Sequence, residues 1–291
     1  MATLRAIAPK ETKKRLKMMV YGPAGVGKTT AVIQFPKPYI IDCERGTENR
    51  EYVKLMEQAG GNVFRTADFD EVLAEVTTLL SVKHDFQTLV IDPFTVLYSQ
   101  LLDKCAKSLV TAQDAEGTSF GRHIGKADRY VRRLYNLMLR LDMNVVVVCQ
   151  AKDVYGEGMK KEGVTFDGHK KLDYLFDLVF EISKRGKERV ATVRKTRLSE
   201  FEDGTSFPWS YASVRERYGA DVLESECKPE ALASSEQVAE MVRLIDVLKV
   251  DQDTTDKWLD KAGAQTWAEM PAAAAQKCID WMKARVTGDS K

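Results

Sequence analysis

Short apolar runs alternate with longer amphipathic segments through the first two thirds of the chain. The clearest strand candidates are residues 18–21, 39–42, 88–92 and 144–150, with weaker ones at 63–66, 178–182 and 189–195. Between them, apolar residues recur at helical spacing, as in residues 72–80, 97–109 and 130–141. The run 144–150 is apolar on both faces, which is typical of a central strand in a parallel sheet. The pattern therefore predicts an α/β fold with a mainly parallel central sheet.

Residues 234–286 show only helical periodicity and predict a small domain of three short helices. Ser234 begins a capping box ahead of the first helix, Gly263 ends the second and Pro271 opens the third. The preceding residues are polar, contain a proline and lack periodicity, which predicts a linker. We therefore expect a basic arm over residues 1–15, an α/β core over 16–223, a linker over 224–233 and a helical module over 234–286.

Composition indicates a globular protein of the cytoplasm. With 291 residues, 44% of them hydrophobic, the chain can form one large domain and a small one. Its longest uninterrupted apolar run covers only residues 145–149, far short of a membrane span, and no apolar segment follows the basic N-terminus. The five cysteines are scattered and never in C-x-x-C spacing, so neither a disulfide framework nor a zinc site is predicted. We expect a cytoplasmic protein with no membrane association.

Charge is distributed unevenly along the chain, although the net charge is only +1. Residues 220–291 contain 14 acidic and 9 basic side chains, so everything before them is net positive. The two parts therefore favour different partners. Because the acidic tail carries no catalytic pattern, we interpret its helices as a protein-interaction or assembly module, the alternative being that they pack back on the core.

A glycine-rich segment follows the first apolar run. Residues 22–29 match G-x-x-x-x-G-K-T between a predicted strand and a predicted helix that extends to Pro36. Glycine leaves the loop backbone free to wrap a polyphosphate, Lys28 can reach the β- and γ-phosphates of ATP, and Thr29 can bind Mg²⁺. A glycine turn with an incidental lysine is the alternative, and the strand, loop and helix context argues against it. The predicted nucleotide-binding residues are Gly22, Pro23, Ala24, Gly25, Val26, Gly27, Lys28, Thr29 and Thr30.

Three polar side chains stand at the ends of other predicted strands. Asp92 ends TLVID and is expected to hold Mg²⁺ directly or through water, unless it only caps the next helix. Glu44 follows IIDC and can orient and deprotonate the attacking water, with an ordinary surface glutamate as the alternative. Gln150 ends NVVVVCQ, where its amide can bind the γ-phosphate and report its loss to the next loop. These positions extend the predicted nucleotide site.

A pair of cations lies near the end of a late strand. Lys195 and Arg197, in VRKTR, can meet the phosphates of the chain's own nucleotide or of a neighbouring subunit's nucleotide. A solvated edge of the sheet is the alternative interpretation of this pair.

The series GPAGVGKTT, IIDCERG, TLVID, VVVVCQ and VRKTR resembles the RecA-type recombinase core, over about residues 15–209. Within that group it looks most similar to the phage-encoded ATP-binding proteins of the single-strand annealing family called Sak-four. The resemblance implies ATP and Mg²⁺ as cofactors, Glu44 as the catalytic glutamate and Gln150 as the nucleotide switch. It also implies that Lys195 and Arg197 complete an ATP site between subunits of a homo-oligomer. A ring, a short filament and a monomer that assembles on DNA all remain open, because the chain has no clear long amino-terminal oligomerisation domain like that of bacterial RecA.

RecA-like proteins bind single-stranded DNA through two loops, and this chain has a candidate for each. The first segment carries a basic stripe at helical spacing, consisting of Arg122, Lys126, Arg129 and Arg133, which can follow phosphates or can be a solvated helix face. The second, a polar loop over residues 152–171, holds Lys160 and Lys161, with Tyr155 and Phe166 for base stacking. Acidic residues nearly cancel the charge of this second loop, which weakens its case.

Other P-loop proteins need motifs that this chain lacks. A GTPase needs N-K-x-D, and the nearest segment, residues 150–153, has no asparagine. A small-molecule kinase needs a lid with arginines, for which Arg185, Arg189 and Arg194 are the candidates, but nucleotide kinases lack the strand-end glutamate and glutamine. We predict a RecA-like ATPase that binds single-stranded DNA and promotes annealing or pairing, with a single-strand binding protein or another recombination protein as a partner of the helical module. A P-loop kinase or a regulatory ATPase without DNA binding is the alternative.

Overall fold

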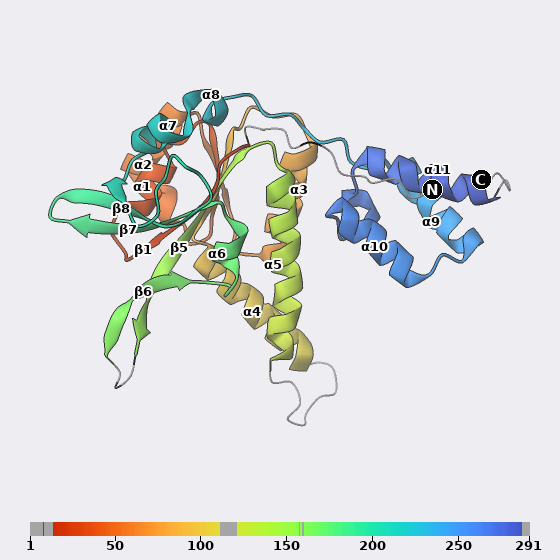
Figure 1. The fold of residues 1–291 in the computed structure, drawn as a ribbon, viewed down its shortest axis with the longest axis horizontal. Helices are drawn as coiled ribbons and strands as arrows, with labels where there is room; N and C mark the ends of the chain where they lie inside the picture. The colour runs from red at the N-terminus through yellow and green to blue at the C-terminus, as the bar shows by residue number, and fades with distance from the viewer. Residues whose placement is uncertain (1–7, 9–13, 111–120, 157, 159, 287–291) are drawn as a thin grey trace.

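A nine-stranded sheet forms the centre of the part of the chain that the structure describes (Figure 1). The structure is a computed structural model that describes residue 8 and residues 14–110, 121–156, 158 and 160–286. The strands lie in the order β3-β2-β4-β5-β1-β7-β8-β9, and β6 pairs with β5. Their bounds are β1 (Lys17–Gly22), β2 (Pro38–Asp42), β3 (Asn62–Arg65), β4 (Thr88–Asp92), β5 (Asn144–Tyr155), β6 (Lys161–Asp167), β7 (Leu178–Arg185), β8 (Glu188–Thr196) and β9 (Ser206–Pro208).

The central strands are parallel, which confirms the predicted α/β fold with a mainly parallel sheet. Strands β3, β2, β4, β5, β1 and β7 form parallel pairs with their neighbours. Only β6, β8 and β9 are antiparallel to the strands beside them. The carboxyl ends of the parallel strands therefore meet at one edge, where loops from several strands can form a shared site.

Helices cover both faces of the sheet. Because side chains alternate along a strand, Met19 and Tyr21 of β1 pack into one hydrophobic cluster and Met18 and Val20 into another. The first cluster is covered by α3 (Phe69–Ser81), α4 (Phe94–Val110) and α5 (Arg122–Arg140). The second is covered by α1 (Lys28–Val32), α2 (Arg50–Ala59), α7 (Tyr211–Tyr218) and α8 (Ala220–Leu223).

The segment predicted as a polar loop over residues 152–171 is largely a β-hairpin. Strand β5 continues past the sheet to Tyr155, and β6 returns beside it in a register that pairs Gln150 with Asp167. The helix α6 (Leu172–Leu175) follows. Figure 1 shows the hairpin projecting beyond the sheet, on the side to which α4 and the first half of α5 also extend. The loop prediction was wrong because the outer strand residues are exposed and polar, so they lack the apolar alternation of a half-buried strand.

The C-terminal helices form a hydrophobic cluster of their own. Helices α9 (Ser235–Leu248), α10 (Gln252–Ala262) and α11 (Ala272–Val286) enclose apolar side chains that include Met241, Leu244, Met270 and Ile279. The predicted capping box at Ser234 is present, and Gly263, with φ of 63°, ends α10. We refer to residues 234–286 as the helical module.

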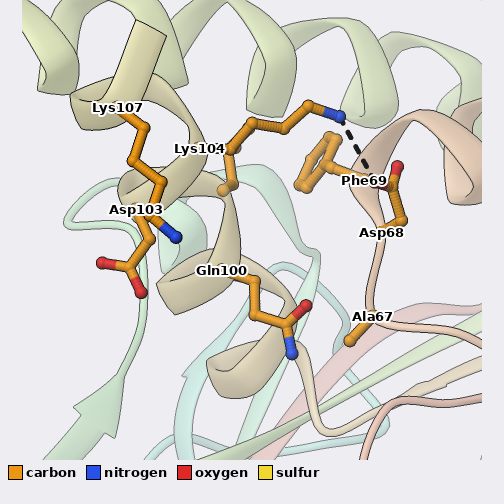
Figure 2. A pocket seen from close by; sticks show the side chains of 8 residues that line it. Ala67, Asp68, Phe69, Gln100, Asp103, Lys104 and Lys107 are labelled. Carbon is orange, nitrogen blue, oxygen red and sulfur yellow. Dashed lines mark hydrogen bonds and ion pairs between the residues drawn. The ribbon is translucent and has the colours of Figure 1, made fainter. Parts of the chain in front are cut away.

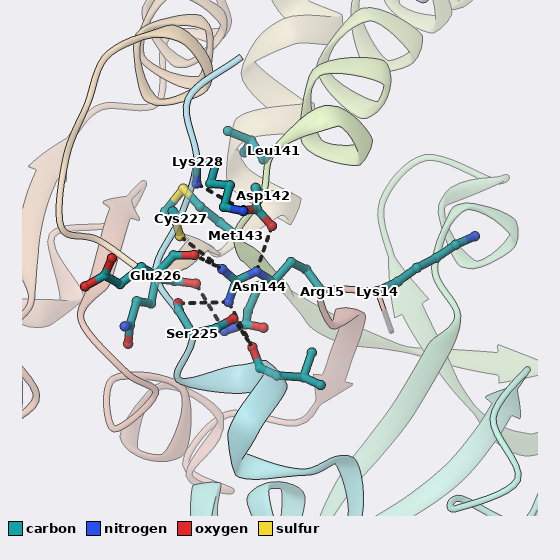
Figure 3. A network of polar contacts seen from close by, with 12 residues as sticks. Lys14, Arg15, Leu141, Asp142, Met143, Asn144, Ser225, Glu226, Cys227 and Lys228 are labelled. Atoms are coloured by element: carbon teal, nitrogen blue, oxygen red, sulfur yellow. Dashed lines mark hydrogen bonds and ion pairs between the residues drawn. The ribbon is translucent and has the colours of Figure 1, made fainter. Parts of the chain in front are cut away.

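The predicted linker is bound to the amino-terminal edge of the sheet (Figure 3). The guanidinium of Arg15 donates to Asp142 Oδ1 at 2.9 Å and to the backbone carbonyls of Val222, Ser225 and Glu226 at 2.6–3.0 Å. The side chain of Arg15, the last residue of the predicted basic arm, is buried, and residues 1–7 and 9–13 of that arm lie outside the described residues. The linker therefore fixes where the chain leaves the core.

Candidate functional site

The phosphate loop joins β1 to α1 at the carboxyl edge of the sheet. A Cβ on Gly22 would lie 2.2 Å from the backbone oxygen of Ile182, so only glycine allows β1 to approach β7 this closely. Gly25 and Gly27 have φ of +74° and +83°, which L side chains rarely adopt. The helix α1 ends at Val32 rather than extending to Pro36, so little more than one helical turn follows the loop.

Lys28 lies over the loop that it is predicted to serve. Its Nζ donates to the backbone oxygens of Gly22 and Pro23, at 2.7 and 2.8 Å. Burial lowers the pKa of Lys28, while the carboxylates of Asp92 and Glu44 oppose that shift. The ammonium is therefore surrounded by oxygen acceptors that phosphate oxygens can replace.

Thr29 and Asp92 form the predicted metal pair. The Thr29 hydroxyl donates to Asp92 Oδ2 at 2.7 Å, joining the start of α1 to the end of β4. Burial raises the pKa of Asp92 to about 6, although the Thr29 hydrogen bond and the Lys28 charge act against the shift. A hydroxyl and a carboxylate are hard oxygen ligands that suit Mg²⁺, and a divalent cation would offset the cost of burying this carboxylate. The residues present therefore fit the predicted ion.

Glu44 and Gln150 meet although they are far apart in sequence. Gln150 Nε2 donates to Glu44 Oε1 at 2.5 Å, and Gln150 lies beside Gly22 in the sheet register. The turn that carries Glu44 is ordered by Asp42, whose carboxylate accepts from the backbone N–H groups of Glu44, Gly46 and Thr47 at 3.0–3.1 Å. The strand-end glutamate and glutamine are thus brought together next to the phosphate loop.

Thr95 is a positioning residue that the sequence analysis missed. The backbone N–H of Gln150 donates to Thr95 Oγ1 at 2.9 Å, and that hydroxyl donates to the backbone oxygen of Asp167 at 2.6 Å. Thr95 thereby connects the start of α4, the end of the buried part of β5 and the end of β6. The available signal was its position three residues after Asp92, at the same edge of the sheet.

A pocket beside the phosphate loop adds residues that the sequence analysis did not assign to the nucleotide. Its volume is about 240 Å³, and its lining includes Gly27, Tyr52, Arg189 and Trp209. The Trp209 indole N–H donates to the backbone oxygen of Gly27 at 3.1 Å, and an added Cβ on Gly27 would lie 3.3 Å from Arg189 Nε. This pocket is the space next to the loop in which a nucleoside could extend from phosphates bound there.

Lys195 and Arg197 lie away from this site. Thr196 pairs with Leu178 at the start of β7, whereas the phosphate loop follows the opposite end of the parallel strands. Lys195 Nζ donates to a backbone oxygen at 2.6 Å, and Arg197 forms an ion pair with Asp177 at 3.1 Å. The expectation that this pair can reach the chain's own nucleotide is therefore wrong, because β8 runs antiparallel and ends at the other edge of the sheet.

The basic stripe predicted for DNA is divided along α5. Arg122 and Arg129 are exposed, whereas the partly buried Lys126 donates to a serine hydroxyl of α4 at 2.8 Å. Arg133 instead forms an ion pair with Glu269, a buried residue of the helical module, and donates to it through Nε at 2.7 Å. The two exposed residues of the predicted stripe therefore lie on the first half of the helix, and Arg133 fastens the module to the core.

The hairpin carries the other predicted DNA contacts. Lys160 and Lys161 are exposed, and Lys161 Nζ lies 2.6 Å from Asp153 Oδ1. Tyr155 is 55% exposed and available to a ligand, whereas Phe166 packs against Tyr21 in the core. Only one of the two predicted stacking residues is therefore free of the core.

A separate pocket of about 490 Å³ lies between the start of α3 and α4 (Figure 2). Lys104, on its wall, donates to Asp68 and Asp70 at 3.3 and 2.7 Å. None of its lining residues belongs to the phosphate loop or to the strand ends described above. It therefore contributes no group to the candidate nucleotide site.

Comparisons with known proteins identify a family for this chain. The AAA domain family matches residues 14–201, more than half of the chain. No curated protein matches. Among solved structures, the chain is similar to the RadB recombinase, with 22% identity over 66% of this chain and 84% of that one and a TM-score of 0.43. No helix in the described residues is long and apolar enough to cross a membrane. With the phosphate loop after β1, and with β5, which carries Gln150, between β1 and the strand that ends in Asp92, the chain belongs to the AAA domain family and has the nucleotide-binding loop of a P-loop NTPase.

Proposed function

We propose that the protein is an ATPase that binds single-stranded DNA and promotes strand annealing or pairing, with ATP turnover coupled to DNA binding. The observation that carries this proposal is the 2.5 Å hydrogen bond between Gln150 and Glu44. It joins the base of the exposed hairpin to the carboxylate that we expect to activate water. A change at the phosphates can therefore reach the hairpin within one side-chain contact.

The chain's own groups divide the work of hydrolysis. Residues 22–30 bind the phosphates of ATP, and Thr29 and Asp92 supply oxygen donors for Mg²⁺, which neutralises phosphate charge when bound. Glu44 accepts a proton from the attacking water, and Lys28 contacts the transferred phosphoryl group. Gln150 responds to the γ-phosphate by keeping or losing its hydrogen bond to Glu44.

Three contacts support a path from the nucleotide to the proposed DNA surface. Thr95 holds both Gln150 and Asp167 at the base of the hairpin, as described above. His169, just after β6, has its Nε2 2.9 Å from Asp128 Oδ1 of α5. This contact links the base of the hairpin to α5, and we propose that Lys160, Lys161 and the exposed arginines of α5 contact one strand together.

The position of Lys195 and Arg197 supports an oligomer. Because the pair lies at the edge opposite the phosphate loop, it can complete an ATP site only in a neighbouring subunit. A head-to-tail arrangement presents this edge of one subunit to the nucleotide edge of the next, and it closes to a ring or continues as a filament. We further infer, from the motif series, a phage annealing ATPase of the Sak-four type that works in the host cytoplasm, with its helical module binding a recombination partner such as a single-strand binding protein.

The test is fluorescence anisotropy of a labelled single-stranded oligonucleotide over a salt series, with and without Mg-ATP, together with ATP turnover with and without the same DNA. We expect salt-dependent binding that ATP alters, and turnover that DNA stimulates. Replacing Arg122 and Arg129 with alanine should weaken binding and flatten the salt slope by about 1.4 units, or about 0.7 for each lost phosphate contact. The control, Lys54→Ala with Lys83→Ala, removes two exposed cations elsewhere and should leave the slope unchanged.

Two outcomes would contradict the proposal. ATP turnover without DNA binding under any nucleotide condition would favour a regulatory ATPase, and phosphate transfer to a small molecule would favour a kinase. An unchanged salt slope in the arginine variant would remove α5 from the DNA site.

A further inference from the structure

The helical module contains an open apolar groove of about 550 Å³. Its lining comes from α10, α11 and the turn between them, and includes the aromatic rings of Trp258 and Trp281. These two rings meet edge to face, with centroids 5.4 Å apart, and Trp281 is 40% exposed. Small residues, Ala262, Ala273 and Ala274, form other parts of the lining. The groove therefore presents apolar surface to solvent in a domain that already has its own buried core.

The groove is positively charged although the module is acidic. Lys261 and Lys277 line it, both exposed, and neither forms an ion pair within the described part of the chain. The guanidinium of Arg285 stacks over Trp281, 3.4 Å from the ring centroid. No aspartate or glutamate is among the lining residues. Every charge at the groove is thus a cation.

Two glutamates of the module are paired with residues outside the groove. Glu240 forms ion pairs with Arg243 and Lys283, and Glu269 is buried against Arg133 of the core. The cations of the groove therefore lack carboxylates from their own module. A ligand that brings carboxylates next to an apolar side chain would match both properties of the groove.

We propose that this groove binds an acidic peptide segment of a partner protein, with one aromatic or aliphatic side chain inserted between Trp258 and the alanines of α11. Carboxylates on either side of that side chain pair with Lys261 and Lys277. The inference deepens the proposed role of the module as an interaction site, and it depends on neither ATP hydrolysis nor DNA binding.

Single-stranded DNA fits the groove less well. Base stacking needs open aromatic faces along a track of cations, but the edge-to-face contact of the two tryptophans occupies part of their surface, and Arg285 covers one face of Trp281. The many exposed carboxylates elsewhere on the module would also repel a long polyanion. A short acidic segment avoids that repulsion because its charges remain within the groove.

The test uses the full chain and a panel of short fluorescein-labelled peptides. Each peptide carries one phenylalanine, leucine or isoleucine among aspartates, and the panel places that apolar residue at each position in turn. We expect anisotropy to report micromolar binding by at least one peptide, with quenching of tryptophan fluorescence. Lys261→Glu with Lys277→Glu should weaken it by roughly tenfold or more, because two attractive contacts become repulsive. Ala273→Glu places a carboxylate at an exposed position of the groove. It should also weaken peptide binding, and it leaves the buried core of the module unchanged.

Matched controls decide the result. Lys249→Glu reverses a charge whose side chain is 80% exposed at the end of α9, outside the groove, and should bind as the wild type does. Peptides with asparagine for aspartate, or serine for the apolar residue, should lose affinity.

Failure of the whole panel, or equal binding of the asparagine peptides, would overturn the proposal. Displacement of the peptide by an oligonucleotide that depends on the same lysines would assign the groove to nucleic acid, and self-association lost in the lysine variant would assign it to a second copy. ATP turnover is measured on the same preparations, so that a failure of peptide binding can be told apart from a failure of the proposed ATPase activity.

Discussion

Two charged residues of the site, Lys28 and Asp92, depart from their ordinary chemistry because burial disfavours their charged forms. Asp92 shows this best: burial raises its pKa to about 6, above the value of 3.8 for an unperturbed aspartate. Ionising a carboxylate there costs free energy in the absence of a cation. The same feature that prepares the position for Mg²⁺ therefore destabilises the ligand-free protein at neutral pH.

Replacing Asp92 with asparagine should stabilise the ligand-free protein while abolishing Mg²⁺-dependent turnover. A group whose folded-state pKa is raised loses stability as pH rises from its unfolded value toward its folded value, from about 4 to about 6 here. The free energy of unfolding of Asp92→Asn should therefore match that of the wild type near pH 4 and exceed it by about 2–3 kcal/mol at pH 7. Urea denaturation at several pH values, without metal or nucleotide, measures this difference. A variant with a lower free energy of unfolding than the wild type at pH 7 would show that burial does not raise the pKa of Asp92.

Glu44 should be needed for hydrolysis and not for binding. Glu44→Gln keeps an acceptor for the Gln150 amide but cannot take a proton, so turnover should fall roughly a hundredfold or more while ATP affinity stays close to that of the wild type. Steady-state phosphate release and a fluorescent nucleotide titration measure the two quantities. Glu48→Gln, an exposed neighbour on the same loop, is the control. Unchanged turnover in Glu44→Gln would make Glu44 an ordinary surface residue.

At the scale of elements, the carboxyl edge of the sheet was predictable and the outer hairpin was not. An apolar run that ends in one polar residue predicts both a buried strand and a functional side chain at its carboxyl end, as at Asp92 and Gln150. The hairpin beyond Gln150 has no such run, since it gains its pairing from β6 rather than from burial. Helix α2 was missed for a similar reason: four of its ten residues are charged, and Met56 is its only buried residue. Trp209 and Arg189 reach the phosphate loop through tertiary packing, which no local pattern records.

Thr95 should transmit nucleotide state to the hairpin. Thr95→Val keeps the shape but removes the hydroxyl that joins Gln150 to Asp167. We expect DNA stimulation of turnover to be lost, basal turnover to be largely retained, and stability to fall by about 1–2 kcal/mol from the unsatisfied backbone groups. The matched control is Thr192→Val, which removes one hydroxyl contact between β8 and β9. Equal stimulation in Thr95→Val and the wild type would break the proposed path.

At the scale of the whole molecule, basic side chains lie at both edges of the sheet and along α5. The nucleotide edge holds Lys28 and the exposed hairpin, while the opposite edge holds Lys195, Arg197 and the buried Arg15 that binds the linker. Ion pairs from Arg133 to Glu269 and from Arg140 to Glu230 attach α5 to the module and to the segment before it. The sequence indicated these basic groups correctly but not their edges, because the antiparallel direction of β8 is decided by its pairing with β7.

This arrangement makes subunit mixing a test of the proposed oligomer. Lys28→Ala should lose ATP binding, and Lys195→Ala with Arg197→Ala should bind ATP without turning it over, provided that the pair acts on the neighbour. In an equimolar head-to-tail mixture, about a quarter of the interfaces join an intact phosphate loop to an intact basic pair, so turnover should return to about that fraction. The double variant Lys54→Ala with Lys83→Ala, mixed with Lys28→Ala, controls for loss of charge alone. Full activity of the Lys195 and Arg197 variant by itself would show that the pair is a solvated edge. An inactive mixture of variants that co-assemble would exclude completion of the site across a subunit boundary.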